Sequence, residues 1–397
     1  MGVRDMLTRA DAALESDLAA SGQRHPQLRR LYHGAVHHRL LVLGLLASIR
    51  GIIDGLGFMY TQDLAYFAAA GGKLLSGHWA NAFVDPRVQI GPIQLLWFAL
   101  ESGLAKILGI SSKLPVTITA NVVITLGVVF VARALLRDRA RPSAPQLELF
   151  IGLVACLGGL GWAAATSGHP TEGFIPLLWV LAAREARAGR VERSGIVIGL
   201  SAGLKLWGGL GAPLLLFHPS VRRVLRGWLA AAITVVGLYG PFFVWGKVNM
   251  LHFEWHVKPQ SPLTLFLGWG SEFTWQMRLV ESAFLLCACA VAALVLRRSL
   301  VGVWAAPLAV VAARFLVDPL NYHYYWLSVG TIALVGAATL LPAGPSWRRV
   351  PVAVAFYVTV FPWFVLVGAA AASYIAFVSI SMIAAAFTLG RRHPAPA

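Results

Sequence analysis

Charged side chains, and acidic ones above all, are scarce in this chain. Only 13% of its 397 residues are charged and 17 are Asp or Glu, whereas 58% are hydrophobic. A typical soluble domain has about 25% charged residues. The shortage excludes an ordinary soluble protein and predicts a polytopic membrane protein.

Cysteine is also rare. The three cysteines, Cys156, Cys287 and Cys289, all lie within apolar runs and lack the spacing of a metal site. We expect them to be packing residues rather than disulfide partners. The sequence shows no low-complexity region and no internal repeat of the transporter type. It therefore predicts a single transmembrane domain over residues 40–390.

The two flanking segments are expected to be cytoplasmic. Residues 1–39 are predicted to be an amphipathic surface segment, and residues 391–397 a short tail. The first 30 residues lack the apolar core of a cleaved signal peptide. Their apolar residues recur at helical spacing, at Leu7, Ala10, Leu14 and Leu18.

Long apolar runs predict an all-α fold with about eleven transmembrane helices, since about 20 apolar residues in a helix cross the hydrocarbon core. The longer runs are 40–58, 92–110, 114–132, 147–166, 226–246, 276–296, 324–341, 350–370 and 371–390. Shorter runs lie at 172–183, 194–217 and 299–313.

Positive charge is spread over short arginine blocks between these runs. The net charge is +16, but no single basic face gathers it, which argues against nucleic acid as a partner. Such blocks mark cytoplasmic loops. All but one can lie on the same side if 194–217 is a pair of short half-helices or a re-entrant hairpin. The exception comprises Arg133, Arg137, Arg139 and Arg141. Either this block breaks the rule that positive charge marks cytoplasmic loops, or one of the apolar runs between 89 and 132 does not cross the membrane.

Polar and aromatic residues gather in the loops on the opposite side. In the first of these loops, Asp63 follows the first span and begins a segment predicted to be an interfacial helix. A carboxylate at this position is a candidate catalytic group. It is equally well placed to cap the helix, and the two roles are compatible. Gln89 ends the same loop, just before the Gly91-Pro92 pair that starts the next helix.

Two further candidates lie in the middle of the chain. The turn Gly168-His169-Pro170-Thr171-Glu172 is either a plain exposed turn or a place where His169 or Glu172 binds a sugar hydroxyl. Lys205 lies within an apolar run, where a lysine costs about 2.5–3.5 kcal/mol on insertion scales. A lipid phosphate would offset this cost. A carboxylate partner, or snorkelling to the membrane surface, would offset it equally well.

The segment 314–326 combines an arginine, an aspartate and a histidine with several aromatic rings. Aromatic rings alone would be a membrane-interface belt, but a belt needs no such charged cluster. The segment is therefore interpreted as functional, with candidates Arg314, Tyr322, His323 and Tyr325. His252 and His256 imitate a zinc site without the glutamate of the zincin pattern. No metal site is predicted.

These motifs resemble the membrane glycosyltransferases of the C-type fold. The pattern comprises Asp63 with Tyr66 three residues on, a small-residue helix ending Leu-Leu-x-Gly, a Gly-x-x-x-Gly-Leu-Lys-x-Trp element and a late Tyr-His-Tyr-Tyr element. It is most similar to actinobacterial polyprenyl-phosphate-mannose-dependent α-1,2-mannosyltransferases (glycosyltransferase family 87) and related arabinofuranosyltransferases. The resemblance covers roughly residues 40–340. It departs at the central turn, where many relatives have Gly-Asn and this chain has Gly168-His169.

The resemblance implies transfer of a sugar, mannose first of all, from a polyprenyl-phosphate donor to a lipid or glycan acceptor. Asp63 matches the family's acidic base, His323 its late-loop histidine and Lys205 its membrane lysine. Lys205, Arg314 and His323 are candidates for the donor phosphate, with Tyr322 and Tyr325 as hydroxyl partners. The expected reaction is inverting and metal-independent, needs no cofactor, and takes place on the extracytoplasmic side of the cell membrane.

Two other functions agree with the same sequence. A transporter or flippase of lipid-linked or polar substrates would share the spans and the buried lysine, although it should show repeats and charges at mid-membrane. A non-catalytic subunit of a cell-envelope synthase is the third possibility.

Overall fold

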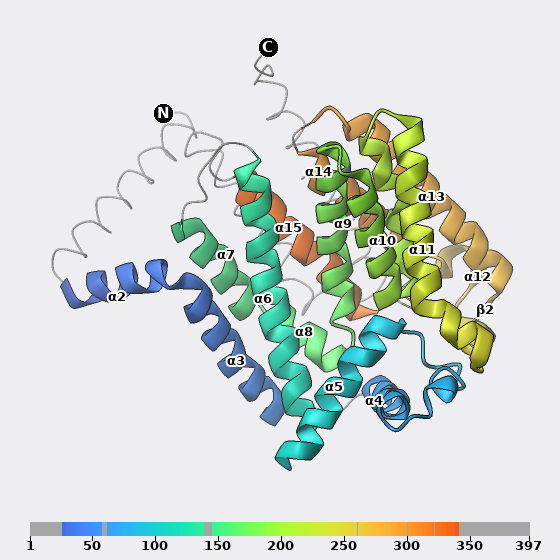
Figure 1. The fold of residues 1–397 in the computed structure, drawn as a ribbon, viewed down its shortest axis with the longest axis horizontal. Helices are drawn as coiled ribbons and strands as arrows, with labels where there is room; N and C mark the ends of the chain where they lie inside the picture. Colours follow the sequence, from blue (N-terminus) through green and yellow to red (C-terminus); the bar gives the residue numbers. More distant parts are fainter. Residues whose placement is uncertain are drawn as a thin grey trace.

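The computed structural model describes residues 26–57, 62–138, 145–259, 261–299, 301–320 and 322–340. This part of the chain is almost entirely helical (Figure 1). Residues 1–25, the predicted spans 350–370 and 371–390 and the tail 391–397 lie outside the described residues.

The elements follow one another in a simple order. They are α2 (Pro26–His37), α3 (Arg39–Gly57), α4 (Gln62–Leu75), η1 (Trp79–Asn81), α5 (Pro92–Leu108), α6 (Lys113–Arg137), α7 (Pro145–Leu157), α8 (Leu160–Ser167), α9 (Thr171–Arg187), α10 (Val191–Leu204), η2 (Leu206–Phe217), α11 (Val221–Trp245), η3 (Met250–His252), β1 (Trp255–His256), α12 (Thr264–Leu267), β2 (Glu272–Phe273), α13 (Trp275–Leu296), α14 (Gly302–Val317), η4 (His323–Tyr325) and α15 (Trp326–Leu340).

The prediction of a helical membrane protein is confirmed in its general form. Among the described residues, five helical segments are long and apolar enough to cross a membrane: α3, α6, the α7–α8 pair, α11 and α13. Shorter apolar helices accompany them, including η2, α14 and α15. The run 147–166, predicted as one helix, is interrupted because Gly159 adopts a φ of 83°, a left-handed conformation that suits glycine and ends α7.

Helix α9 forms the centre of the bundle. It packs against α10, α14, α15, α6 and η2, and its side chains Ile175, Trp179 and Ala183 are fully buried. Outer helices such as α11 and α13 instead expose many large apolar residues. Apolar residues on the outside of a helix bundle are expected where the surrounding solvent is lipid.

The run 194–217 folds as two short helices, as one of the sequence-based alternatives requires. Helix α10 ends at Leu204, Lys205 is extended with φ −160° and ψ 138°, and η2 begins at Leu206. The two pieces pack against each other. Lys205 is therefore placed at a break between helices rather than inside one.

Residues of three arginine blocks meet at one end of the bundle, in the part of the chain that the structure describes. Arg39, at the start of α3, and Arg133, near the end of α6, both bond Glu148 of α7, with Arg133 Nε 2.8 Å from Glu148 Oε1. Arg184, near the end of α9, lies 2.6 Å from Asp138. The sequence-based prediction left out the block that begins at Arg133. Because Arg133 lies beside Arg39, this block lies at the same end as the block that contains Arg39.

The path of helix α5 explains why the arginine block at Arg133 was an exception in the sequence-based prediction. Helix α5 begins at the opposite end, where the Gly91 N–H donates to the Leu204 carbonyl oxygen at 2.7 Å. Helix α6 begins beside the C-terminal half of α3, since a Cβ at Gly51 would lie 2.5 Å from the Ile118 Cα. Helix α6 then runs to the arginine end, so α5 starts and finishes on the other side. The structure favours the alternative in which one run between 89 and 132 does not cross.

Helix α4 lies at this second end, against α5 (Figure 1), and its Phe67 ring contacts His169 just before α9. It buries Leu64, Phe67 and Ala70 but leaves Leu75 54% exposed. The predicted apolar stripe is thus partly a packing face. Helix α2, from the predicted N-terminal segment, exposes Leu28, Leu31 and Tyr32.

Candidate functional site

The central turn brings a histidine and a glutamate to the start of α9. Gly168 ends α8 with φ 69°, a left-handed conformation for which glycine is favoured. Pro170 follows as the N-cap residue of α9, and Glu172 falls in the first turn, where an acidic side chain is stabilised by the helix dipole. The turn is held from α5, since Gln94 Nε2 donates to the Gly168 carbonyl oxygen at 3.3 Å.

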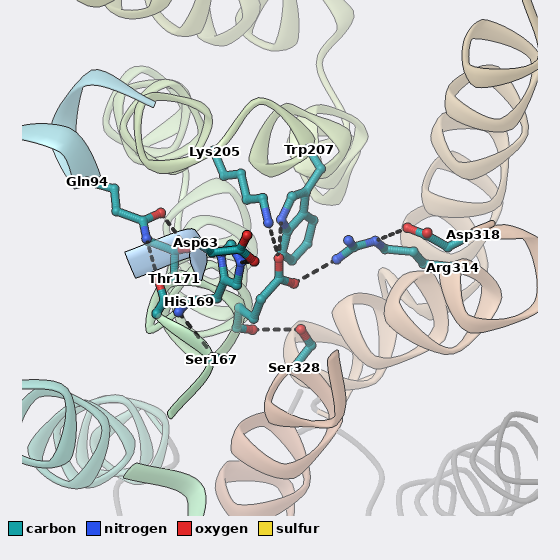
Figure 2. A network of polar contacts seen from close by, with 12 residues as sticks. Asp63, Gln94, Ser167, His169, Thr171, Lys205, Trp207, Arg314, Asp318 and Ser328 are labelled. Carbon is teal, nitrogen blue, oxygen red and sulfur yellow. Dashed lines mark hydrogen bonds and ion pairs between the residues drawn. The ribbon is translucent and has the colours of Figure 1, made fainter. Parts of the chain in front are cut away.

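Glu172 is a fully buried carboxylate that pairs with two cations, Lys205 and Arg314. Figure 2 shows the side chains of Lys205, Trp207 and Arg314 converging on one place. Its Oε1 atom accepts from Lys205 Nζ at 2.8 Å and from Trp207 Nε1 at 3.2 Å. Its Oε2 atom accepts from an Arg314 nitrogen at 2.9 Å. Three ways of offsetting the charge of Lys205 were considered from the sequence: a lipid phosphate, a carboxylate partner or snorkelling. The structure shows the carboxylate partner. Because Glu172 offsets the charge of Lys205, the cost of burial no longer requires a bound phosphate.

Arg314 is fixed by its own surroundings. It lies in the last turn of α14, and its Nε donates to Asp318 at 3.1 Å. Its guanidinium carbon lies 4.2 Å from the ring centres of both Trp207 and Tyr325. Such contacts add cation–π attraction to the ion pairs, so Arg314 is held rigidly.

Asp63 forms a dyad with His169. Asp63 lies in the first turn of α4, and its Oδ2 atom is 3.3 Å from His169 Nε2. The imidazole is stacked 4.5 Å from the Tyr324 ring and lies edge-on to Phe67 at 5.2 Å. The Asp63 side chain is 52% exposed, whereas that of His169 is 5% exposed.

The charges of this dyad follow from its environment. The hydrogen bond from His169 lowers the pKa of Asp63 below its ordinary value, and burial lowers the pKa of His169. At neutral pH Asp63 is therefore a carboxylate and His169 a neutral ring. Since an ionised carboxylate only accepts hydrogen bonds, His169 Nε2–H is the donor. The buried Nδ1 atom has no hydrogen-bond partner among the described residues.

A cavity of about 540 Å³ joins these groups, a size typical of small-molecule sites. Of the sequence-predicted site residues, the cavity is lined by Asp63, Gln89, His169, Lys205, Arg314, Tyr322 and Tyr325. Glu172 lies just behind the wall and positions its cations. The structure thus gathers residues that are far apart in sequence.

The remaining predicted positions have more limited roles in this geometry. Gln89 Nε2 donates to the carbonyl oxygens of Pro86 and Met250, both at 2.6 Å, so its amide nitrogen holds two loops together. Tyr322 stacks on Tyr324 at 5.4 Å. The side chain of His323 lies outside the described residues.

Several cavity residues were missed by the sequence-based prediction. Arg278 and Glu281 of α13 are paired at 2.6 Å and line the cavity with Phe253, Trp255 and Trp275. Two charged residues at the start of an otherwise apolar span are a recognisable signal of a functional site, which would have identified the pair. The aromatic residues gave no such signal, because loop aromatics are common at membrane interfaces.

Within the part of the chain that the structure describes, no group of three or more His, Cys, Asp or Glu side chains is placed to hold a metal ion. Comparison of the sequence with models of known protein families and with curated proteins finds no match.

Proposed function

We propose that this protein is a membrane glycosyltransferase that moves a sugar, most simply mannose, from a polyprenyl-phosphate donor to a lipid or glycan acceptor. The observation that carries the proposal is the Asp63–His169 dyad, which presents a half-exposed carboxylate to a cavity also lined by Lys205 and Arg314. A base facing cationic groups is what transfer from a phosphate leaving group requires.

The proposed reaction assigns one role to each group. Asp63 takes the proton of the acceptor hydroxyl as its oxygen bonds to the anomeric carbon of the sugar. The bond from that carbon to the phosphate oxygen breaks, and its electron pair leaves with the polyprenyl phosphate. Attack from the face opposite the phosphate inverts the anomeric centre. His169 keeps Asp63 ionised and oriented through the 3.3 Å hydrogen bond.

Lys205 and Arg314 stabilise the departing phosphate in this scheme. Both are already paired with Glu172, so their contribution is directed N–H groups rather than excess positive charge. Preorganised donors of this kind need little rearrangement as negative charge develops.

One observation favours the alternative of a transporter. The chain breaks between α10 and η2 at a charged residue, Lys205, and interrupted helices often form the binding site of transporters. The two functions differ in their products. The purified protein, given polyprenyl-phosphate mannose and lipid or glycan fractions of cell membranes, should yield a product heavier by one hexose in mass spectrometry. A transporter would move its substrate without changing its mass.

We predict that the cavity end is extracytoplasmic, because the arginine blocks lie at the other end. In a cysteine-free variant, Ser76→Cys near α4 should react with an impermeant maleimide in intact cells. Ala188→Cys, in the exposed turn after α9, should react only after the cells are opened. Labelling of the second position alone in intact cells would place the cavity in the cytoplasm.

Replacing Lys205 by methionine should weaken donor binding. A hydrogen bond to a charged group is worth about 1.5–3 kcal/mol, so the KM for polyprenyl-phosphate mannose should rise roughly tenfold or more, with a smaller change in the KM for the acceptor. Lys258→Met is the matched control, since Lys258 does not line the cavity. A folded Lys205→Met protein with an unchanged donor KM would leave Lys205 only the role of partner to Glu172.

A further inference from the structure

The cavity has a second wall that the proposed reaction does not use. It is formed by Phe253 just before β1, by Trp255 in β1 and by Trp275 at the start of α13, all of which line the cavity. Trp255 and Trp275 meet edge to face at 4.8 Å, and Phe253 and Trp255 do so at 5.6 Å. Trp275 Nε1 also donates to the Leu251 carbonyl oxygen. These contacts make the three rings one fixed cluster.

A charged pair lies in the same wall. Arg278 donates to Glu281 at 2.6 Å, and its guanidinium carbon lies 4.8 Å from the centre of the Trp255 ring. Both residues line the cavity, together with Ser282. The wall therefore offers ring faces beside groups that donate and accept hydrogen bonds.

We propose that this wall binds the acceptor and that the part of the acceptor bound there is a sugar ring. The inference rests on the proposed glycosyltransferase function and specifies its second substrate. A sugar has apolar C–H faces that pack on aromatic rings, and hydroxyl groups at its rim that bond an arginine and a carboxylate. The dyad-bearing wall then holds the base, and the aromatic wall holds the ring that carries the attacking hydroxyl.

A bare hydrocarbon chain fits this wall less well. Covering the Arg278–Glu281 pair with hydrocarbon would remove the remaining water from Arg278, whose side chain is 18% exposed, and supply no hydrogen bonds, which is unfavourable. Trp255 belongs to a small apolar core with Val257 and Phe273, whereas Phe253 and Trp275 remain partly exposed and so keep surface free to contact a bound ring. The acceptor is accordingly a glycoside or glycolipid rather than a simple lipid alcohol.

The first arm of the test measures catalysis in a detergent without a sugar headgroup. Wild-type protein is given polyprenyl-phosphate mannose and either octyl α-mannoside or 1-octanol, which share a chain but differ in the ring. We expect transfer to the mannoside at least about tenfold more efficient, and an acceptor KM raised by about tenfold in Trp275→Leu and Phe253→Leu, with the donor KM unchanged. Trp269→Leu is the control, because Trp269 is 76% exposed and does not line the cavity.

The second arm measures binding without turnover. Methyl α-mannoside, methyl arabinofuranoside and methyl glucoside are tested for thermal stabilisation of the wild type and of the folded Trp275→Leu variant. Stabilisation of the wild type by one of them, lost in the variant and kept in Trp269→Leu, supports a sugar site even if no donor is consumed. The inference is overturned if octanol serves as well as the mannoside, or if none of the three glycosides stabilises the wild type. If the protein transferred mannose to octanol but not to the mannoside, the proposed glycosyltransferase function would be supported and the sugar site would be rejected.

Discussion

Purified Asp63→Asn protein is expected to fold normally and to lose nearly all turnover. Asparagine has the size of aspartate, can still accept the hydrogen bond from His169, and caps a helix about as well. It cannot take a proton. Loss of general-base catalysis costs about 100-fold or more in rate, so turnover of polyprenyl-phosphate mannose should fall by at least that factor while the melting temperature hardly changes.

The control for this variant is Glu254→Gln, which removes an exposed carboxylate from a loop that contributes to the cavity wall. Its turnover should be near that of the parent. If folded Asp63→Asn protein also retained activity within a few fold of the parent, Asp63 would not be the base. If Asp63 had only a capping role, Asp63→Asn would leave both the rate and the stability near normal, because asparagine caps a helix about as well as aspartate. Glu172 and Asp85 would then be the next carboxylates to test.

Glu172→Gln is expected to have the largest effect on stability. The amide keeps the shape of the side chain but leaves Lys205 and Arg314 without the charge that offsets theirs. Removing one partner of a buried ion pair costs about 3–5 kcal/mol, a large part of the stability of an ordinary protein. The variant should give a much lower melting temperature in detergent and a small yield of monodisperse protein.

Asp138→Asn provides the matched control, because its carboxylate also pairs with an arginine but is 45% exposed. An exposed pair contributes about 0–1 kcal/mol. The double variant Glu172→Gln/Lys205→Met should be more stable than Glu172→Gln alone, since Arg314 keeps its bond to Asp318 when the second cation is gone. If Glu172→Gln and Asp138→Asn lowered the melting temperature equally, the buried cluster around Glu172 would not be what stabilises the fold.

The positions of the helices were largely predictable because each apolar run has the length that the hydrocarbon core requires. Runs such as 40–58, 114–132 and 276–296 correspond closely to α3, α6 and α13. Periodicity and length do not report local backbone breaks, so the interruption at Gly159 went unnoticed. They also do not tell which apolar helix crosses. The ion pairs of Glu148 with Arg39 and Arg133 place the start of α3 beside the last turns of α6, which favours α5 as the run that does not cross.

For the site residues too, some properties were determined by the sequence and others only by the tertiary structure. By itself, the sequence determined the class of protein and the kinds of residues that carry chemistry, because a charged or hydrogen-bonding side chain beside lipid is costly and stands out against an apolar background. It could not determine partners, because Asp63 and His169, or Glu172 and Arg314, are joined across long stretches of chain. Only the tertiary structure turned Lys205 from a lone buried cation into a paired one. Only the tertiary structure brought Arg278, Glu281 and the aromatic wall to the same cavity as the dyad, since these contacts exist only once α4, α9, α13 and α14 are packed together.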